Sequence, residues 1–260
     1  MTPGHDINYI ALAGALHQFG YPDSLPTPPM NLIGDMGGGG MLLAVGVLAA
    51  LWEARSSGKG QVVDAAMVDG TALMMISMFS MMAAGEWDER RGSNVTQGAA
   101  PFYGVYETSD RQFVSLAAAE EAFYADLCRK LGLDAADWAD RYDESNWAER
   151  RAALAELFRS RTRDEWCELL EGSEACFAPV LSPSEAVEHP HNKVRETFIE
   201  VDGVVQPAPA PRFSRTASAV RGGPPAPGAH TGEVLGECGL TESEISRLRH
   251  LGVLAPDDGP

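Results

Sequence analysis

Apolar residues in the first third of the chain recur at helical spacing between short polar or glycine-rich breaks. This pattern predicts a helix over 7–19, with Asp6 as its N-cap, and a long apolar helix over 40–56. A third helix is expected over 68–85. Between the second and third helices, the sequence QVVDA at 61–65 predicts a short strand.

Beyond residue 97 the pattern changes to the alternation that is typical of strands. The sequence FYGVYETSDRQFVSLAAA at 102–119 holds two β-rich runs around a Ser-Asp turn, which predicts a hairpin. Helices are expected after it over 121–131, 147–158 and 163–171. A hairpin followed by helices indicates a small α/β unit over 98–200.

The last part of the chain begins with an extended, proline-rich segment and is expected to end in a helix. Thr241 and Glu244 form a T-x-x-E pattern, which predicts a capping box at the start of that helix. Leu240 and Ile245 can form the hydrophobic staple beside it, and the helix is expected to end at Gly252. A helix with such defined ends is expected to pack on another part of the fold.

Composition and charge narrow the class of protein. The net charge of −17 argues against binding to nucleic acid or to an anionic membrane surface, because phosphate groups would repel it. Four cysteines lie far apart with no C-x-x-C pair, which indicates reduced thiols and a cytoplasmic location. The apolar run at 41–54 is too short for a membrane span, and the run at 62–84 carries two aspartates. The histidines show no spacing typical of metal ligands.

His5 precedes the expected start of the first helix. The free N–H groups and the dipole at a helix start favour a nearby anion. A histidine there can act as a base toward a substrate whose developing oxyanion is held by the same helix end. A surface histidine near a terminus is the simpler alternative.

Asp35 lies just before four consecutive glycines, and Glu120 ends the predicted hairpin at the entry of the next helix. Glycines can let a ligand approach the backbone closely, but the run lacks the G-K-[ST] ending of a P-loop, and a flexible turn is equally compatible. Six of the ten methionines lie within 67–82. Periodic methionines are typical of a core, and a deformable wall for a variable acyl chain is the alternative.

Several motifs together resemble those of α-methylacyl-CoA racemases, which belong to the family III CoA-transferase superfamily. The motifs are GHDINYIALAG at 4–14, NLIGDMGGGG at 31–40, GQVVDAAMVDG at 60–70 and CFAPVLSPSEA at 176–186. They occur in the order that the family shows, and the resemblance covers essentially the whole chain.

The resemblance implies the family III CoA-transferase fold, an α/β fold with two domains. Residues 1–97 would be the C-terminal part of a Rossmann-like large domain, and 98–200 the small α/β domain. Residues 201–260 would return to pack the C-terminal helix on the large domain. Intact members form an interlocked homodimer with the active site between the domains. They also carry a segment before the G-H-D motif, with basic residues for the CoA phosphates, so a separate N-terminal half is a further expected partner.

The resemblance also implies the reaction and its residues. His5, Asp35 and Glu120 match the catalytic positions, and the CoA-contacting loop matches Gly4, His5, Asp6, Ile7, Asn8 and Tyr9. The reaction inverts the carbon α to a thioester by 1,1-proton transfer through an enolate. CoA is part of the substrate, and no metal or other cofactor is expected. Two bases on opposite faces of one carbon suit this chemistry, and Glu120 could hold the protonation state of one of them.

Two alternatives remain open. In the CoA-transferase branch, a nucleophilic aspartate on a segment aligned with the G-H-D region, or upstream of it, forms a covalent intermediate. The other alternative is a non-catalytic fragment that associates with a partner polypeptide.

The sequence does not distinguish between acyl groups for a racemase of lipid metabolism. Branched fatty acyl, bile-acid-like and sterol-derived acyl groups all fit a methionine-rich wall.

Overall fold

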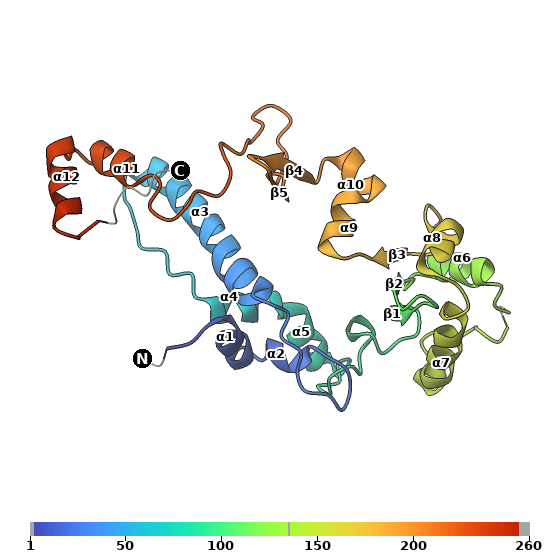
Figure 1. Ribbon diagram of the computed structural model, residues 1–260. Coiled ribbons are helices and arrows are strands. Elements are labelled where there is room, and N and C mark those ends of the chain that lie inside the picture. The colour runs from blue at the N-terminus through green and yellow to red at the C-terminus, as the bar shows by residue number, and fades with distance from the viewer. Residues whose placement is uncertain (1–2, 135, 255–260) are drawn as a thin grey trace. The chain divides into compact units, whose positions relative to one another are not determined.

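The computed structural model describes residues 3–134 and 136–254. It divides into two compact units on either side of the Val180–Leu181 bond, and each unit is considered by itself (Figure 1). The finer boundaries expected after residues 97 and 200 stay predictions. The first unit begins with helices, which are α1 (Asp6–Leu12), α2 (Ala15–Gln18), the π-helix η1 (Leu32–Met41), α3 (Leu42–Ser57), α4 (Met67–Met74) and α5 (Ile76–Ala84).

The helix expected over 7–19 is broken into α1 and α2. Gly14 adopts a left-handed conformation, with φ +85°, between the two pieces, and such a conformation interrupts a right-handed helix. The predicted N-cap was wrong by one residue. His5 has the extended backbone of an N-cap, and Asp6 is the first helical residue. This shift matters because it exposes the histidine and buries the aspartate.

The glycine run is helical, so the alternative of a flexible turn is wrong. It lies in η1, which continues into α3. A Cβ at Gly38 would lie 2.8 Å from the backbone nitrogen of Thr71, and a Cβ at Gly70 would lie 2.0 Å from the carbonyl oxygen of Gly38. The glycines therefore allow η1 and α4 to pack backbone against backbone, which any side chain would prevent.

Together η1 and α3 form an apolar helix of 26 residues, Leu32–Ser57, and no residue of α3 is buried. The helix is longer than the apolar run that the sequence indicated at 41–54. By length and composition it could cross a membrane. The pair α4 and α5, bent by 50° where they join, passes the same test as one broken span. Length and composition alone do not separate a membrane span from the core helix of a larger soluble protein.

The strand expected at 61–65 does not form. These residues carry no regular structure, and Val62 is 94% exposed. A strand needs a neighbour for its backbone N–H and C=O groups, and no strand within the described ranges pairs with this segment.

The hairpin predicted at 102–119 is confirmed. Strands β1 (Tyr103–Glu107) and β2 (Phe113–Ala117) are antiparallel, with Val105 opposite Ser115, and β3 (Phe177–Val180) pairs with the other edge of β2. Around this sheet lie helices α6 (Glu121–Leu131), α7 (Trp147–Phe158) and α8 (Arg163–Leu170), close to the predicted bounds.

Aromatic side chains form the core of the sheet and its helices. The Phe158 ring is fully buried, with its centroid 5.2 Å from that of Tyr106 and 4.9 Å from that of Trp166. The indole N–H of Trp166 donates to the carbonyl oxygen of Phe158 at 2.9 Å, so the buried polar atom has a partner. Burying these rings supplies much of the apolar area that stabilises this part of the unit.

The second unit holds small elements joined by proline-rich loops. The predicted capping box is confirmed, because Thr241 Oγ1 accepts from the N–H of Glu244 and Glu244 Oε2 accepts from the N–H of Thr241. Ile245 in the same helix is 1% exposed. The elements are α9 (Pro183–Glu188), α10 (Pro190–Arg195), the hairpin of β4 (Phe198–Val201) and β5 (Val204–Pro207), α11 (Thr231–Glu237) and α12 (Glu242–His250).

Replacing Phe158 by alanine should lower the free energy of unfolding by about 3–5 kcal/mol, because it removes a buried ring between two others. Urea unfolding followed by tryptophan fluorescence measures this. Phe113→Ala is the matched control, since Phe113 is 46% exposed on β2, and it should cost about 1 kcal/mol. Equal losses in the two variants would contradict the assignment of Phe158 to the core.

Candidate active site

His5 stands at the start of α1 with its side chain exposed. Its backbone N–H donates to Asn8 Oδ1 at 3.0 Å, which fixes the entry of the chain into the helix. The N–H groups of a first helical turn lack partners within the helix and carry partial positive charge. The imidazole of His5 therefore lies beside donors that could hold a developing negative charge.

Asp6 joins the start of α1 to the start of η1. Its Oδ2 accepts a hydrogen bond from the backbone N–H of Asp35 at 2.7 Å, across 29 residues of sequence. The side chain of Asp6 is buried, whereas those of His5 and Asp35 are exposed. The structure thus brings the backbone of Asp35 to the residue that follows His5, with both candidate bases open to a ligand.

Gly34 makes room for this contact. A Cβ at Gly34 would lie 2.5 Å from Asp6 Oδ2 and 2.9 Å from Asp6 Cγ. On the other side of the junction, Asn31 Nδ2 donates to Asp35 Oδ2 at 3.3 Å and so restrains the carboxylate itself. The sequence gives no sign of the pairing between Asp6 and Gly34, because neither residue type nor spacing marks it.

Glu120 is the exposed N-cap residue of α6. No hydrogen bond or ion pair within the described ranges joins it to His5 or Asp35. Its neighbours are firmly held, because Arg141 Nε and Tyr142 Oη each donate to the carbonyl oxygen of Ala119 at 2.9 Å. The sequence gives no sign of either contact, since both side chains lie beyond α6 along the chain.

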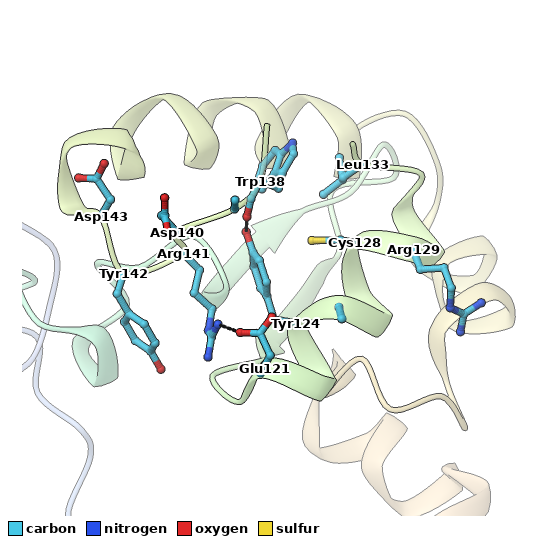
Figure 2. A pocket seen from close by; sticks show the side chains of 12 residues that line it. Glu121, Tyr124, Cys128, Arg129, Leu133, Trp138, Asp140, Arg141, Tyr142 and Asp143 are labelled. Atoms are coloured by element: carbon cyan, nitrogen blue, oxygen red, sulfur yellow. Dashed lines mark hydrogen bonds and ion pairs between the residues drawn. The ribbon is translucent and has the colours of Figure 1, made fainter. Parts of the chain in front are cut away.

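Arg141 also forms an ion pair with Glu121, the residue after Glu120, as the dashed line in Figure 2 shows. Its guanidinium carbon lies 4.7 Å from the centre of the Tyr142 ring, within the range of a cation–π contact. Arg141 therefore contacts the residues on both sides of Glu120. This arrangement fixes the backbone from which the Glu120 carboxylate extends.

A cavity of about 800 Å³ lies between α6 on one side and Leu133 and residues 138–143 on the other (Figure 2). Tyr124 Oη donates to the carbonyl oxygen of Trp138 at 3.0 Å across it, and burial raises the pKa of Tyr124. Burial also raises the pKa of the Cys128 thiol, which lines the same cavity. Neither group is therefore ionised at neutral pH, and Cys128 is not an activated nucleophile.

A second cavity, of about 530 Å³, lies beside α5 and α2. Its lining includes Met75, Met78, Met81 and Phe19. None of the six clustered methionines is buried, so the expectation that they form a core was wrong for the described structure. Flexible thioether side chains around a cavity can adapt to apolar groups of different shape.

The loop that was matched to CoA contact is small and carries no lysine or arginine. Ile7 and Asn8 are exposed, whereas the buried Asp6 side chain leaves only its backbone for a ligand.

The guanidinium of Arg91 is used for contacts within the protein, because it donates to the carbonyl oxygens of His17 and Tyr21, each at 3.2 Å. Within residues 3–134 and 136–254, no group of three or more His, Cys, Asp or Glu side chains is placed to hold a metal ion.

The family model for CoA-transferase family III matches residues 1–231. The chain belongs to CoA-transferase family III. It is 41% identical to the Alpha-methylacyl-CoA racemase of Mus musculus over 98% of this chain and 67% of that protein. It is 39% identical to the Alpha-methylacyl-CoA racemase of Homo sapiens over 94% of this chain and 65% of that protein.

The fold of the family is confirmed by solved structures. A CAIB/BAIF family protein from Brucella suis superimposes with a TM-score of 0.70 at 23% identity, over 91% of this chain and 65% of the other. The resemblance inferred from the sequence motifs is therefore confirmed at the level of family and fold. The chain spans about two thirds of the length of the two racemases, 67% and 65%.

Gly34→Ala should lower the free energy of unfolding by about 1–3 kcal/mol, because its methyl group would overlap the Asp6 carboxylate. Thermal unfolding followed by circular dichroism measures the loss. Gly60→Ala is the control, since a Cβ there meets nothing within 4 Å, and its effect should stay below about 1 kcal/mol. Equal stability of the two variants would show that the contact at Gly34 is looser than described.

Proposed function

We propose that this chain forms the catalytic part of a racemase that interconverts (2R)- and (2S)-2-methylacyl-CoA thioesters. The hydrogen bond from the Asp35 N–H to Asp6 carries the proposal, because it draws two separate segments with exposed candidate bases to one place. The similarity to two racemases at 41% and 39% identity supports the same reaction.

In the proposed reaction, one of His5 and Asp35 is deprotonated and removes the α-proton from its face of the substrate. The electron pair of the broken C–H bond moves to the thioester carbonyl, which becomes an enolate. N–H groups at the start of α1 stabilise the enolate oxygen. The other base then gives its proton to the opposite face of the same carbon, and the electron pair returns from the enolate to form the new C–H bond.

The remaining assignments follow the same proposal. In this proposal Glu120 holds the protonation state of one of the bases, although no hydrogen bond among the described residues joins it to either, and Arg141 steadies its backbone. The loop at Gly4–Tyr9 contacts CoA, and the methionine-lined cavity beside α5 receives an apolar acyl group. CoA enters as part of the substrate, the reaction needs no other cofactor, and the enzyme works in cytoplasmic lipid metabolism without nucleic acid or membrane partners.

A CoA-transferase is the alternative within the family. Its covalent mechanism needs a carboxylate that can attack an acyl group. Asp6 in the G-H-D motif is 6% exposed as a residue, and its Oδ2 is held by the Asp35 N–H. This burial favours the racemase, since a nucleophile must reach the substrate carbonyl.

Substituting either proposed base should abolish racemisation. His5→Gln and Asp35→Asn should each lower the rate of inversion by at least about 100-fold, since each removes a proton-transferring group. The measurement incubates each enantiomer of a 2-methylacyl-CoA with protein in deuterated water and follows inversion and α-deuterium by chiral chromatography and mass spectrometry. His17→Gln, at an exposed histidine of α2, should retain the parent rate. A parent chain without inversion, or full activity in His5→Gln, would overturn the proposal.

We also propose that a second copy of the chain covers α3 in a homodimer. The helix is apolar, no residue on it is buried, and Leu48 and Trp52 are 67% and 76% exposed. Apolar surface on this scale is typical of a protein interface.

Sedimentation velocity should show a dimer for the parent chain and a monomer for Leu48→Lys, because a buried unpaired charge would destabilise the interface. Val194→Lys is the control, since Val194 is 89% exposed on α10, and it should stay dimeric. A parent monomer that associates only with a separately supplied N-terminal half of a relative would contradict the homodimer and favour that partner.

A further inference from the structure

We propose that the side chain of Asp6 has a positioning role: it sets the place of Asp35 relative to His5 and does not itself reach the substrate. The inference rests on the proposed function, since the position of Asp35 matters to racemisation only if Asp35 transfers a proton. It assigns to the third residue of the G-H-D motif a role distinct from binding CoA and from nucleophilic attack.

Asp6 is placed between the two proposed bases. It follows His5 directly in the chain, and its Oδ2 accepts the N–H of Asp35 at 2.7 Å. One residue therefore connects covalently to one base and by a charge-assisted hydrogen bond to the backbone of the other. Such bonds are stronger and more directional than those between neutral groups, so a carboxylate suits this position.

The burial of Asp6 points to a role beyond ordinary packing. The residue is 6% exposed, and its Oδ1 is a buried atom with no hydrogen-bond partner among the described residues. A buried carboxylate oxygen without a partner destabilises a fold. Packing alone therefore does not account for Asp6 at this position, and a functional role does. Holding Asp35 offers that explanation.

The surroundings leave the Asp6 carboxylate little freedom to move. A Cβ at Gly34 would lie 2.5 Å from Asp6 Oδ2 and 3.1 Å from Ile10 Cγ2, so backbone and side chains are already in close contact there. Asp6 and Gly34 thus fix the entry of η1 against α1. A displacement of about 1 Å at a catalytic group can lower a rate by about 100-fold, and losing this contact would permit one.

The test compares three variants of the full chain. Asp6→Ala removes the acceptor, and Asp6→Asn keeps an oxygen that can accept the Asp35 N–H. Asp69→Asn is the matched control, because Asp69 is an exposed aspartate in the first turn of α4. Each variant is tested with both enantiomers of a 2-methylacyl-CoA in deuterated water, with inversion and exchange with retention measured separately.

Asp6→Ala should lower inversion in both directions by about 100-fold. Exchange with retention should persist for the one enantiomer whose α-proton faces His5, because His5 alone can remove that proton and return a deuteron. Asp6→Asn should restore inversion to within about 10-fold of the parent, and Asp69→Asn should match the parent. A misfolded Asp6→Ala would lose both exchange and inversion. If a soluble, folded Asp6→Ala loses both, the proposal is overturned.

Hydrogen exchange of the Asp35 amide, followed by NMR, tests the contact without using activity. The amide should be protected in the parent, in Asp6→Asn and in Asp69→Asn, and unprotected in Asp6→Ala. An unprotected amide in the parent would overturn the positioning role even if racemisation is found. If the amide is protected but the parent does not racemise, the proposed function is overturned. The positioning role then fails as well, because it rests on that function. Loss of protection in Asp6→Ala with unchanged inversion would show that the contact does not position a base.

Discussion

The hydrogen bond between the Asp35 N–H and the Asp6 carboxylate is the constraint on which the candidate site depends. It joins α1 to η1 across 29 residues, and close packing at Gly34 leaves no room for a different arrangement. Without it, His5 and Asp35 would be two exposed residues on neighbouring helices. With it, the two segments that carry them meet at one buried carboxylate.

Elements with local signals could be predicted from the sequence. The hairpin of β1 and β2, helix α6 and the capping box at Thr241 all depend on residues within a few positions of one another. Patterns of apolar residues and caps express such local preferences directly. The candidate site residues come from a family resemblance, and their roles stay predictions.

The remaining features depend on contacts between distant segments. The π-helix forms where Gly38 meets Gly70, which no local pattern reveals. The segment at 61–65 has strand-like letters but lacks a neighbouring strand, so composition alone misled the prediction. Arg141, which contacts Ala119 and Glu121, was likewise missed because its partners lie about 20 residues away. Long-range packing decides each of these cases over local propensity.

Membership of a family that includes both racemases and transferases leaves the chemistry to individual side chains. For this chain, the proposed choice between the two reactions rests on whether the carboxylate of the G-H-D motif faces the substrate or the protein interior. Asp6 faces the interior and contacts backbone, whereas Asp35 and His5 remain exposed. The fold alone could serve either reaction.

The backbone contact between Gly38 and Gly70 has a consequence for how this chain can change over evolution. Two helices that touch without intervening side chains cannot be re-spaced by exchanging one apolar residue for another. A side chain at either glycine would push η1, which carries Asp35, away from α4.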